Sequence, residues 1–183
     1  MSESAQAAAP PRRQGLVVLY TGQGKGKTTA ALGMVFRALG RKMRVAVVQF
    51  IKGKWMTGER MFADAQEGLV FEVTGRGFTW DSDDLSRDAL ACREGWERAA
   101  RLIASGDYDI VVLDELTYAL NYGFVATSDV LAALRGRPAA VHVVITGRNA
   151  APELIEAADL VTEMRSLKHP YERGIPAQQG VDY

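Results

Sequence analysis

Near the N-terminus, an apolar run, a glycine-rich turn and a helical stretch follow one another without a gap, and this order restricts the fold more than any other feature. The run GLVVLYT (Gly15–Thr21) is apolar and β-branched, which is typical of a strand buried on both faces. The turn is TGQGKGKTT (Thr21–Thr29). Thr28–Leu39 has the small residues of a helix that packs closely on a sheet, and Gly40 is placed to end it.

The same alternation of strand and helix continues along the chain. Each step between parallel strands needs a crossover, so the pattern predicts an α/β fold with a doubly wound, mostly parallel sheet in a single domain, residues 15–183. Lys52–Met61 carries no secondary-structure signal, and the polar tail Ser166–Tyr183 is expected to wrap the surface. Further strands are predicted at Val45–Phe50, Leu69–Val73, Asp109–Leu113, Ala140–Thr146 and Leu160–Met164, and helices at Asp83–Ser105, Leu116–Tyr122, Ser128–Arg135 and Pro152–Ala158.

Composition limits the class of protein. The 183 residues fit about one domain, and 48% of them are hydrophobic, which is enough for a sizeable core. The chain has 22 Lys and Arg against 22 Asp and Glu, so its formal net charge is zero. This balance does not indicate binding to nucleic acid or to an anionic membrane. Cys92 is the only cysteine, which excludes an intramolecular disulfide.

The first 14 residues, MSESAQAAAPPRRQ, are expected to form a flexible arm (1–14). They lack the apolar core of a secretory signal. No apolar run in the chain approaches the roughly 20 residues that span a bilayer. We therefore expect a cytoplasmic protein.

The glycine-rich turn has the residues of a phosphate-binding loop. Gly22, Gly24 and Gly26 allow the backbone to approach a phosphate closely, at a helix N-terminus whose dipole favours anions. Lys27 supplies a cation, and the Thr28 hydroxyl can bind Mg²⁺. The stretch departs from the pattern GxxxxGK[ST] only at the first glycine, so it predicts a P-loop NTPase-like (RecA-like) domain that binds a triphosphate.

A second apolar strand supplies the acids that such a site needs. IVVLDEL (Ile110–Leu116) ends in Asp114 and Glu115, and a carboxylate at this position helps to hold Mg²⁺ in P-loop proteins. Neighbouring strand residues point to opposite faces, so the two acids need not contact the same ion. VITGRNA delivers Arg148 to the same edge of the sheet, where it could contact phosphate or lie on the surface.

These parts predict binding of Mg-ATP and leave the reaction open. Glu115 could position water in an ATPase, whereas a small-molecule kinase needs an acceptor site. GRGFTW places Phe78 and Trp80 just after a predicted strand, where they form a platform for a large flat ligand or cap the core. A regulatory module that binds nucleotide without turnover would keep the same phosphate loop.

Six blocks in this order resemble the P-loop corrinoid adenosyltransferases, which transfer adenosyl from ATP to cobalt. The resemblance runs from Gly15 to Tyr183, and Thr21 agrees with this family, whose loop lacks the first glycine. Gln23 stands where asparagine is more often expected and keeps an amide. The most specific blocks are QFIKG, GFTW and the closing KHPYERGIPAQQGVDY; the others are TGQGKGKTTAALG, VVLDELTYAL and VITGR.

The resemblance implies roles for particular residues. Mg²⁺ or Mn²⁺ would bind Thr28 and Glu115 with Asp114 in support, and Phe78 and Trp80 would lie against the lower face of the corrin. The implied catalytic residues are Lys27, Thr28, Glu115, Phe78 and Trp80. The residues expected to bind ATP or corrinoid are Gly22, Gln23, Gly24, Lys25, Gly26, Lys27, Thr28, Thr29, Phe78, Trp80 and Arg148.

The implied reaction is transfer of the 5′-deoxyadenosyl group of ATP to Co(I) of a corrinoid, with release of triphosphate, in adenosylcobalamin biosynthesis or salvage. The resemblance further implies a homodimer and an electron donor such as a reduced flavoprotein or free flavin. A kinase or ATPase on the same fold would instead yield ADP and give Phe78 and Trp80 no role.

Overall fold

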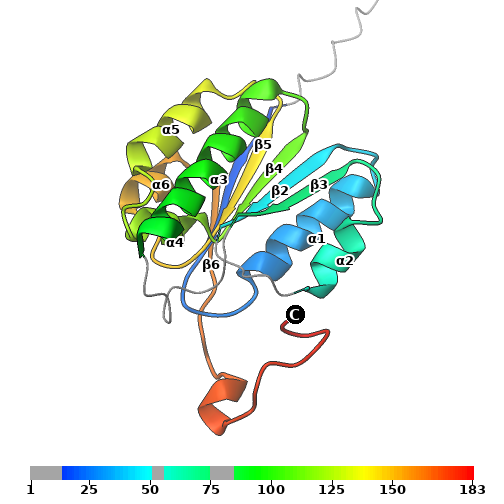
Figure 1. Ribbon diagram of the computed structural model, residues 1–183, viewed down its shortest axis with the longest axis vertical. Helices are drawn as coiled ribbons and strands as arrows, with labels where there is room; N and C mark the ends of the chain where they lie inside the picture. The colour runs from blue at the N-terminus through cyan, green and yellow to red at the C-terminus, as the bar shows by residue number, and fades with distance from the viewer. Residues whose placement is uncertain (1–13, 51–55, 75–84) are drawn as a thin grey trace, which may run out of the picture.

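In the computed structural model, which describes residues 14–50, 56–74 and 85–183, six strands form one sheet in the order β3-β2-β4-β5-β1-β6 (Figure 1). Every neighbouring pair of these strands is parallel. The carboxyl ends of the strands therefore meet at one edge. The strands are β1 (Val17–Thr21), β2 (Val45–Gln49), β3 (Leu69–Val73), β4 (Ile110–Asp114), β5 (His142–Thr146) and β6 (Leu160–Glu163).

Helices cover both faces of the sheet (Figure 1). The helices α1 (Lys27–Leu39) and α2 (Gly58–Ala63) lie on one face. The other face is covered by α3 (Leu85–Ser105), α4 (Leu116–Asn121), α5 (Thr127–Gly136) and α6 (Pro152–Ala157).

The apolar strands separate two cores because their side chains alternate between the faces. Within β1, Val17 and Leu19 belong to the core under α3 and α5, whereas Val18 belongs to the core under α1. Every residue of β2 and β4 is buried, as a central parallel strand requires. This is the physical reason for the continuous apolar runs in the sequence.

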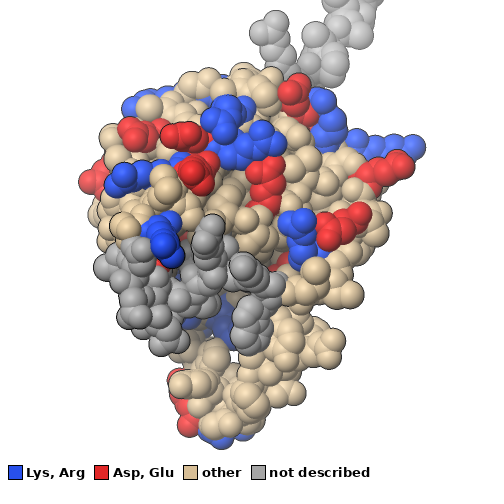
Figure 2. Space-filling view, in the orientation of Figure 1, with Lys and Arg blue, Asp and Glu red and all other residues tan. Residues whose placement is uncertain are grey.

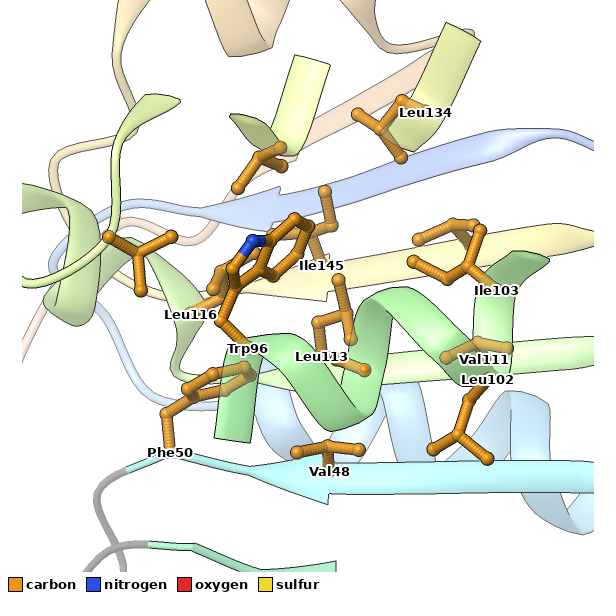
Figure 3. Close-up of a cluster of buried hydrophobic side chains, with 14 of the residues drawn as sticks. Val48, Phe50, Trp96, Leu102, Ile103, Val111, Leu113, Leu116, Leu134 and Ile145 are labelled. Atoms are coloured by element: carbon orange, nitrogen blue, oxygen red, sulfur yellow. The ribbon is translucent and has the colours of Figure 1, made fainter. Parts of the chain in front are cut away.

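The larger core fixes α3 across the sheet near the edge where the strands end. Figure 3 shows Trp96 of α3 among Phe50, Leu113 and Leu116, side chains that come from the ends of β2 and β4 and from the start of α4. The Trp96 side chain is 9% exposed. Truncation of such a buried aromatic side chain costs about 3–5 kcal/mol, so this contact holds the edge of the sheet firmly.

The two strands expected to carry the nucleotide site are not neighbours. Strand β5 lies between β1, which leads into the phosphate loop, and β4, which ends in the acids. Groups from β1 and β4 must therefore meet across the end of β5. A polar residue at that end is in a position to join them.

Most predicted elements agree with the structure to within about three residues at each end, and β3 has the predicted bounds. The prediction that Lys52–Met61 has no secondary structure was wrong, because α2 begins at Gly58. This helix has six residues and buries only Ala63, so it carries too little apolar periodicity to be recognised. The described strands are all parallel, which sharpens the predicted mostly parallel sheet.

The remaining parts of the chain lie outside the sheet. The tail after β6 leaves the sheet, forms the 3-10 helix η2 (Pro170–Arg173) and turns back toward the N-terminus of α1 (Figure 1). The predicted arm falls outside the described residues except for Gln14. Within the described ranges, no helix has both the length and the apolar character needed to cross a membrane. Figure 2 shows acidic and basic side chains interspersed over the visible face, in keeping with the zero net charge.

Candidate active site

The phosphate loop is held against the chain that follows β6. Gly24 N–H donates to the Met164 carbonyl oxygen at 2.7 Å, and a Cβ on Gly24 would lie 2.7 Å from the Arg165 carbonyl carbon. Gly22 and Gly26 have φ of 97° and 108°, which side chains disfavour. Close approach at Gly24 and positive φ at the other two positions explain why the loop is rich in glycine.

Lys27 lies at the centre of this loop with its side chain 5% exposed. Its Nζ donates to the carbonyl oxygens of Gly22 at 2.9 Å and Gly24 at 2.7 Å. An ammonium group has three donors, so the third remains for a ligand. Burial lowers the pKa of Lys27, while the negative charge of Glu115 opposes that shift.

The buried carboxylate of Asp114 is the hub that joins three strands and α1. Its Oδ1 accepts from the hydroxyls of Thr28 at 2.9 Å and Thr146 at 2.7 Å, and its Oδ2 accepts from Gln49 Nε2 at 2.9 Å. Asp114 is only 1% exposed, and three donors offset the cost of its burial. Thr146 is the last residue of β5, so its hydroxyl joins the end of this strand to the end of β4, while Thr28 brings the start of α1 to the same carboxylate.

Glu115 follows the last residue of β4 and, unlike Asp114, lines the cavity beside the phosphate loop. It has a left-handed backbone, with φ of 59° and ψ of 27°, and its N–H donates to Thr146 Oγ1 at 2.9 Å. A non-glycine residue in this region costs about 1–3 kcal/mol and often marks a functional site. Glu115 lines the same cavity as Lys27 and Thr28.

The cavity has a volume of about 460 Å³ and lies at the carboxyl edge of the sheet, beside the phosphate loop. Arg148 lines it, which places this side chain at the site rather than on a remote surface. The residues around the cavity come from the phosphate loop, α1, the start of α2, the ends of β4 and β5, and the tail: Gly24, Lys25, Gly26, Lys27, Thr28, Thr29, Leu32, Gly58, Glu59, Glu115, Arg148, Gly180, Val181, Asp182 and Tyr183.

The loop that carries Arg148 is fixed from two sides. The Arg148 carbonyl oxygen accepts from Thr117 Oγ1 at 2.7 Å and Asn121 Nδ2 at 3.1 Å, both on α4. Gln23 Nε2 donates to Asn149 Oδ1 at 2.7 Å and so connects the phosphate loop to the same segment. Gln23 is exposed, and its side chain holds the segment that follows Arg148 by this hydrogen bond to Asn149.

Comparison with known proteins identifies the family. The pattern of the family described as ATP:corrinoid adenosyltransferase BtuR/CobO/CobP matches residues 13–183. The chain belongs to this family. It is 44% identical over 179 residues to the corrinoid adenosyltransferase of Escherichia coli K12, covering 98% of this chain and 91% of that protein. It is 48% identical over 171 residues to the corrinoid adenosyltransferase of Pseudomonas aeruginosa, covering 93% and 84%.

A solved structure supports the fold alone. The flagellar accessory protein FlaH of Methanocaldococcus jannaschii superposes with a TM-score of 0.54 at 11% identity, covering 82% of this chain and 71% of that one. Together these comparisons confirm the predicted α/β class, the enzyme class and the family activity, which is adenosyl transfer from ATP to a corrinoid.

The structure brings together most of the residues predicted for this adenosyltransferase site. Phe78 and Trp80 lie outside the described residues, so their expected place under the corrin stays a prediction. Sequence reasoning missed Gln49, Thr146 and the tail. Gln49 and Thr146 are the last residues of buried strands at the edge of the site. A polar residue at the end of an apolar strand was the sequence signal that could have identified them.

Proposed function

We propose that the cavity at the phosphate loop holds the triphosphate of ATP while its 5′-deoxyadenosyl group is transferred to the Co(I) centre of a corrinoid. The observation that carries this assignment is the convergence of Lys27, Thr28, Glu115 and Arg148 on one cavity beside a glycine-rich helix N-terminus. The N-terminus of α1 follows the loop glycines directly, and its dipole favours an anion such as the triphosphate. Lys25 and Thr29 line the same space from the loop and from α1.

The reaction needs cations around the leaving group. Co(I) attacks the C5′ carbon, the C5′–O bond breaks, and its electron pair leaves with the triphosphate. Negative charge on the bridging oxygen therefore grows in the transition state, and preorganised cations there lower the barrier. Lys27 presents its remaining N–H, and Arg148 adds a second positive charge in the same cavity.

The residues at the cavity also fit a divalent cation. Thr28 donates its hydroxyl proton to Asp114, which leaves the oxygen lone pairs available as ligands. The Glu115 carboxylate lines the same cavity, and oxygen donors of this kind suit Mg²⁺ or Mn²⁺. We assign Thr28 and Glu115 as protein ligands and Asp114 as the residue that orients Thr28. When bound, the ion supplies positive charge that stabilises the triphosphate.

Manganese binding tests this ligand assignment. Electron paramagnetic resonance of Mn²⁺ with ATP measures metal affinity in Glu115→Gln, Asp114→Asn and the exposed control Asp107→Asn. Loss of one carboxylate ligand is expected to weaken Mn²⁺ binding about tenfold or more in Glu115→Gln. Asp107 lies between α3 and β4, away from the carboxyl edge, so its variant should retain wild-type affinity. Normal Mn²⁺ affinity in Glu115→Gln, with loss in Asp114→Asn, would reverse the two roles.

The resemblance extends the proposal to the corrinoid. Phe78 and Trp80 would occupy its lower face and displace the axial base, which favours reduction of Co(II) to Co(I). Phe78→Ala and Trp80→Ala should then impair the coupled reduction more than the reaction of cob(I)alamin reduced beforehand. Equal losses in both assays would count against this role.

The same resemblance supports a homodimer that works in the cytoplasm and receives electrons from a reduced flavoprotein or free flavin. Light scattering during size-exclusion chromatography measures the oligomeric state. A mass of one 19.9 kDa chain would contradict the dimer.

A further inference from the structure

The C-terminal segment Gln178–Tyr183 forms part of the phosphate cavity although it is far from the phosphate loop in sequence. Four of its residues, from Gly180 to Tyr183, line the cavity. Figure 1 shows the red end of the chain returning beneath α1, close to the N-terminus of that helix. The specific closing block of the sequence therefore reaches the triphosphate site.

This segment is a compact turn that presents one carboxylate. Gln178 N–H donates to Asp182 Oδ2 at 2.8 Å, and Asp182 N–H donates back to the Gln178 carbonyl oxygen at 2.8 Å. Gly180 has φ of 77° and donates its N–H to the Tyr183 carbonyl oxygen at 2.8 Å. These bonds orient the side chain of Asp182 before any ligand binds.

The other carboxylate oxygen of Asp182 forms an ion pair with Lys25 of the phosphate loop. The Asp182 side chain is largely covered, whereas that of Lys25 is about half exposed. Both residues line the cavity. The Asp182 carboxylate is thus paired with the Lys25 ammonium group, which lines the cavity proposed to hold the triphosphate.

The tail buries little of its surface. None of the residues 166–183 is buried, and the Leu167 and Val181 side chains are 91% and 78% exposed. The Lys25 end of the ion pair is about half exposed, so water and salt screen the pair and limit its contribution to stability. Displacement of the segment therefore costs far less free energy than displacement of the strands and helices that form the rest of the cavity.

We propose that Asp182 is a built-in competitor for Lys25, and that Gln178–Tyr183 is a strap that a triphosphate displaces when it binds and that returns as the triphosphate leaves. This inference rests on the proposed placement of the triphosphate at the phosphate loop. The strap lowers the affinity for free triphosphate, which is the product that must depart after C5′–O cleavage. It also keeps the charge of Lys25 neutralised between turnovers.

Calorimetric titration with inorganic tripolyphosphate at low ionic strength tests the strap in the full-length chain. Asp182→Asn removes the charge and keeps an oxygen for the Gln178 N–H, so tripolyphosphate should bind about two- to fivefold more tightly. The gain should shrink at high salt and in the Lys25→Gln background. Glu172→Gln, an equal charge change in η2 outside the cavity lining, should bind like the wild type.

The outcomes separate this inference from the proposed function. Unchanged or weaker tripolyphosphate binding by Asp182→Asn, with normal binding by the wild type, would overturn the strap alone. An equal gain in Glu172→Gln would show a general charge effect and would also overturn it. No binding of tripolyphosphate to the wild type would overturn the phosphate site and the strap together.

Discussion

Two walls of the same cavity are built in opposite ways. The wall at the ends of the strands is backed by Asp114, a buried carboxylate that accepts three hydrogen bonds from Thr28, Gln49 and Thr146. The wall formed by the tail contains Asp182, a carboxylate that pairs with Lys25. In the proposed function, the groups that must be aligned for reaction are fixed by buried hydrogen bonds, and the group that competes with product is free to move.

The two lysines of the phosphate loop give the largest expected difference between the walls. In the proposed function the buried cation of Lys27 stabilises the leaving group, so Lys27→Met should lower kcat/KM for ATP by about 10²–10³-fold. Lys25→Met removes an exposed cation, and a loss of only a few-fold is expected. Steady-state kinetics with reduced corrinoid measures both variants. Equal losses would show that burial does not distinguish their roles.

The two adjacent acids should separate stability from activity. In Asp114→Asn, the new NH₂ group faces at least one of the three donors that bind the carboxylate, so a buried hydrogen bond is lost. The free energy of unfolding should fall by about 1–3 kcal/mol. Glu115→Gln should leave stability nearly unchanged and abolish most activity. Urea denaturation followed by circular dichroism measures the first effect. Similar destabilisation by both variants would contradict the division between a structural hub and a ligand.

The titration of the Cys92 thiol is a probe of the core packing behind the wall at the ends of the strands. Its side chain is buried beneath Phe50, and burial, helped by the negative charge of Asp88, raises the pKa of the thiol to about 11. The folded state therefore holds the proton more tightly than the unfolded chain does. The free energy of unfolding is therefore unaffected by titration of this thiol below the unfolded pKa near 9, and it falls by about 3 kcal/mol in all as the pH rises through the range from about 9 to 11.

Urea denaturation across this pH range checks the effect, with Cys92→Ala as the control that removes the titrating group. The wild-type curve should fall more steeply with pH than the curve of the variant. Parallel curves would mean that the thiol does not titrate with a raised pKa.

The smallest expected effect concerns the exposed link between the loop and Arg148. Gln23→Asn shortens the side chain by one methylene and breaks the hydrogen bond to Asn149 Oδ1. An exposed hydrogen bond of this kind contributes about 1 kcal/mol or less, so KM for ATP should rise two- to fourfold with little change in kcat. A large loss of kcat would place Gln23 in the reacting site instead.

The wall at the ends of the strands could be predicted from the sequence better than the wall formed by the tail. Continuous apolar runs identified the central strands, and the two acids at the end of IVVLDEL were predicted to lie at the nucleotide site. The left-handed backbone of Glu115, which directs its side chain, was not predicted. The partners of Asp114 could not be read from spacing, because Gln49 and Thr146 come from separate strands and meet only in the folded sheet.

The short helix α2 and the tail show where local patterns fail. Six residues of α2 bury a single side chain, so no apolar period marks them. The tail block was recognised as specific to the family, yet the ion pair between Lys25 and Asp182 joins residues that are far apart in the sequence. Local propensity carries no information about such a contact.

In the proposed function, this cavity positions ATP for attack at C5′ rather than at a phosphorus atom. An anaerobic assay with chemically reduced cob(I)alamin and MgATP tests it directly, with the corrinoid spectrum and the phosphate product followed together. We expect a light-sensitive alkylcobalt species and one triphosphate for each corrinoid converted. Accumulation of ADP with no change in the corrinoid spectrum would contradict it.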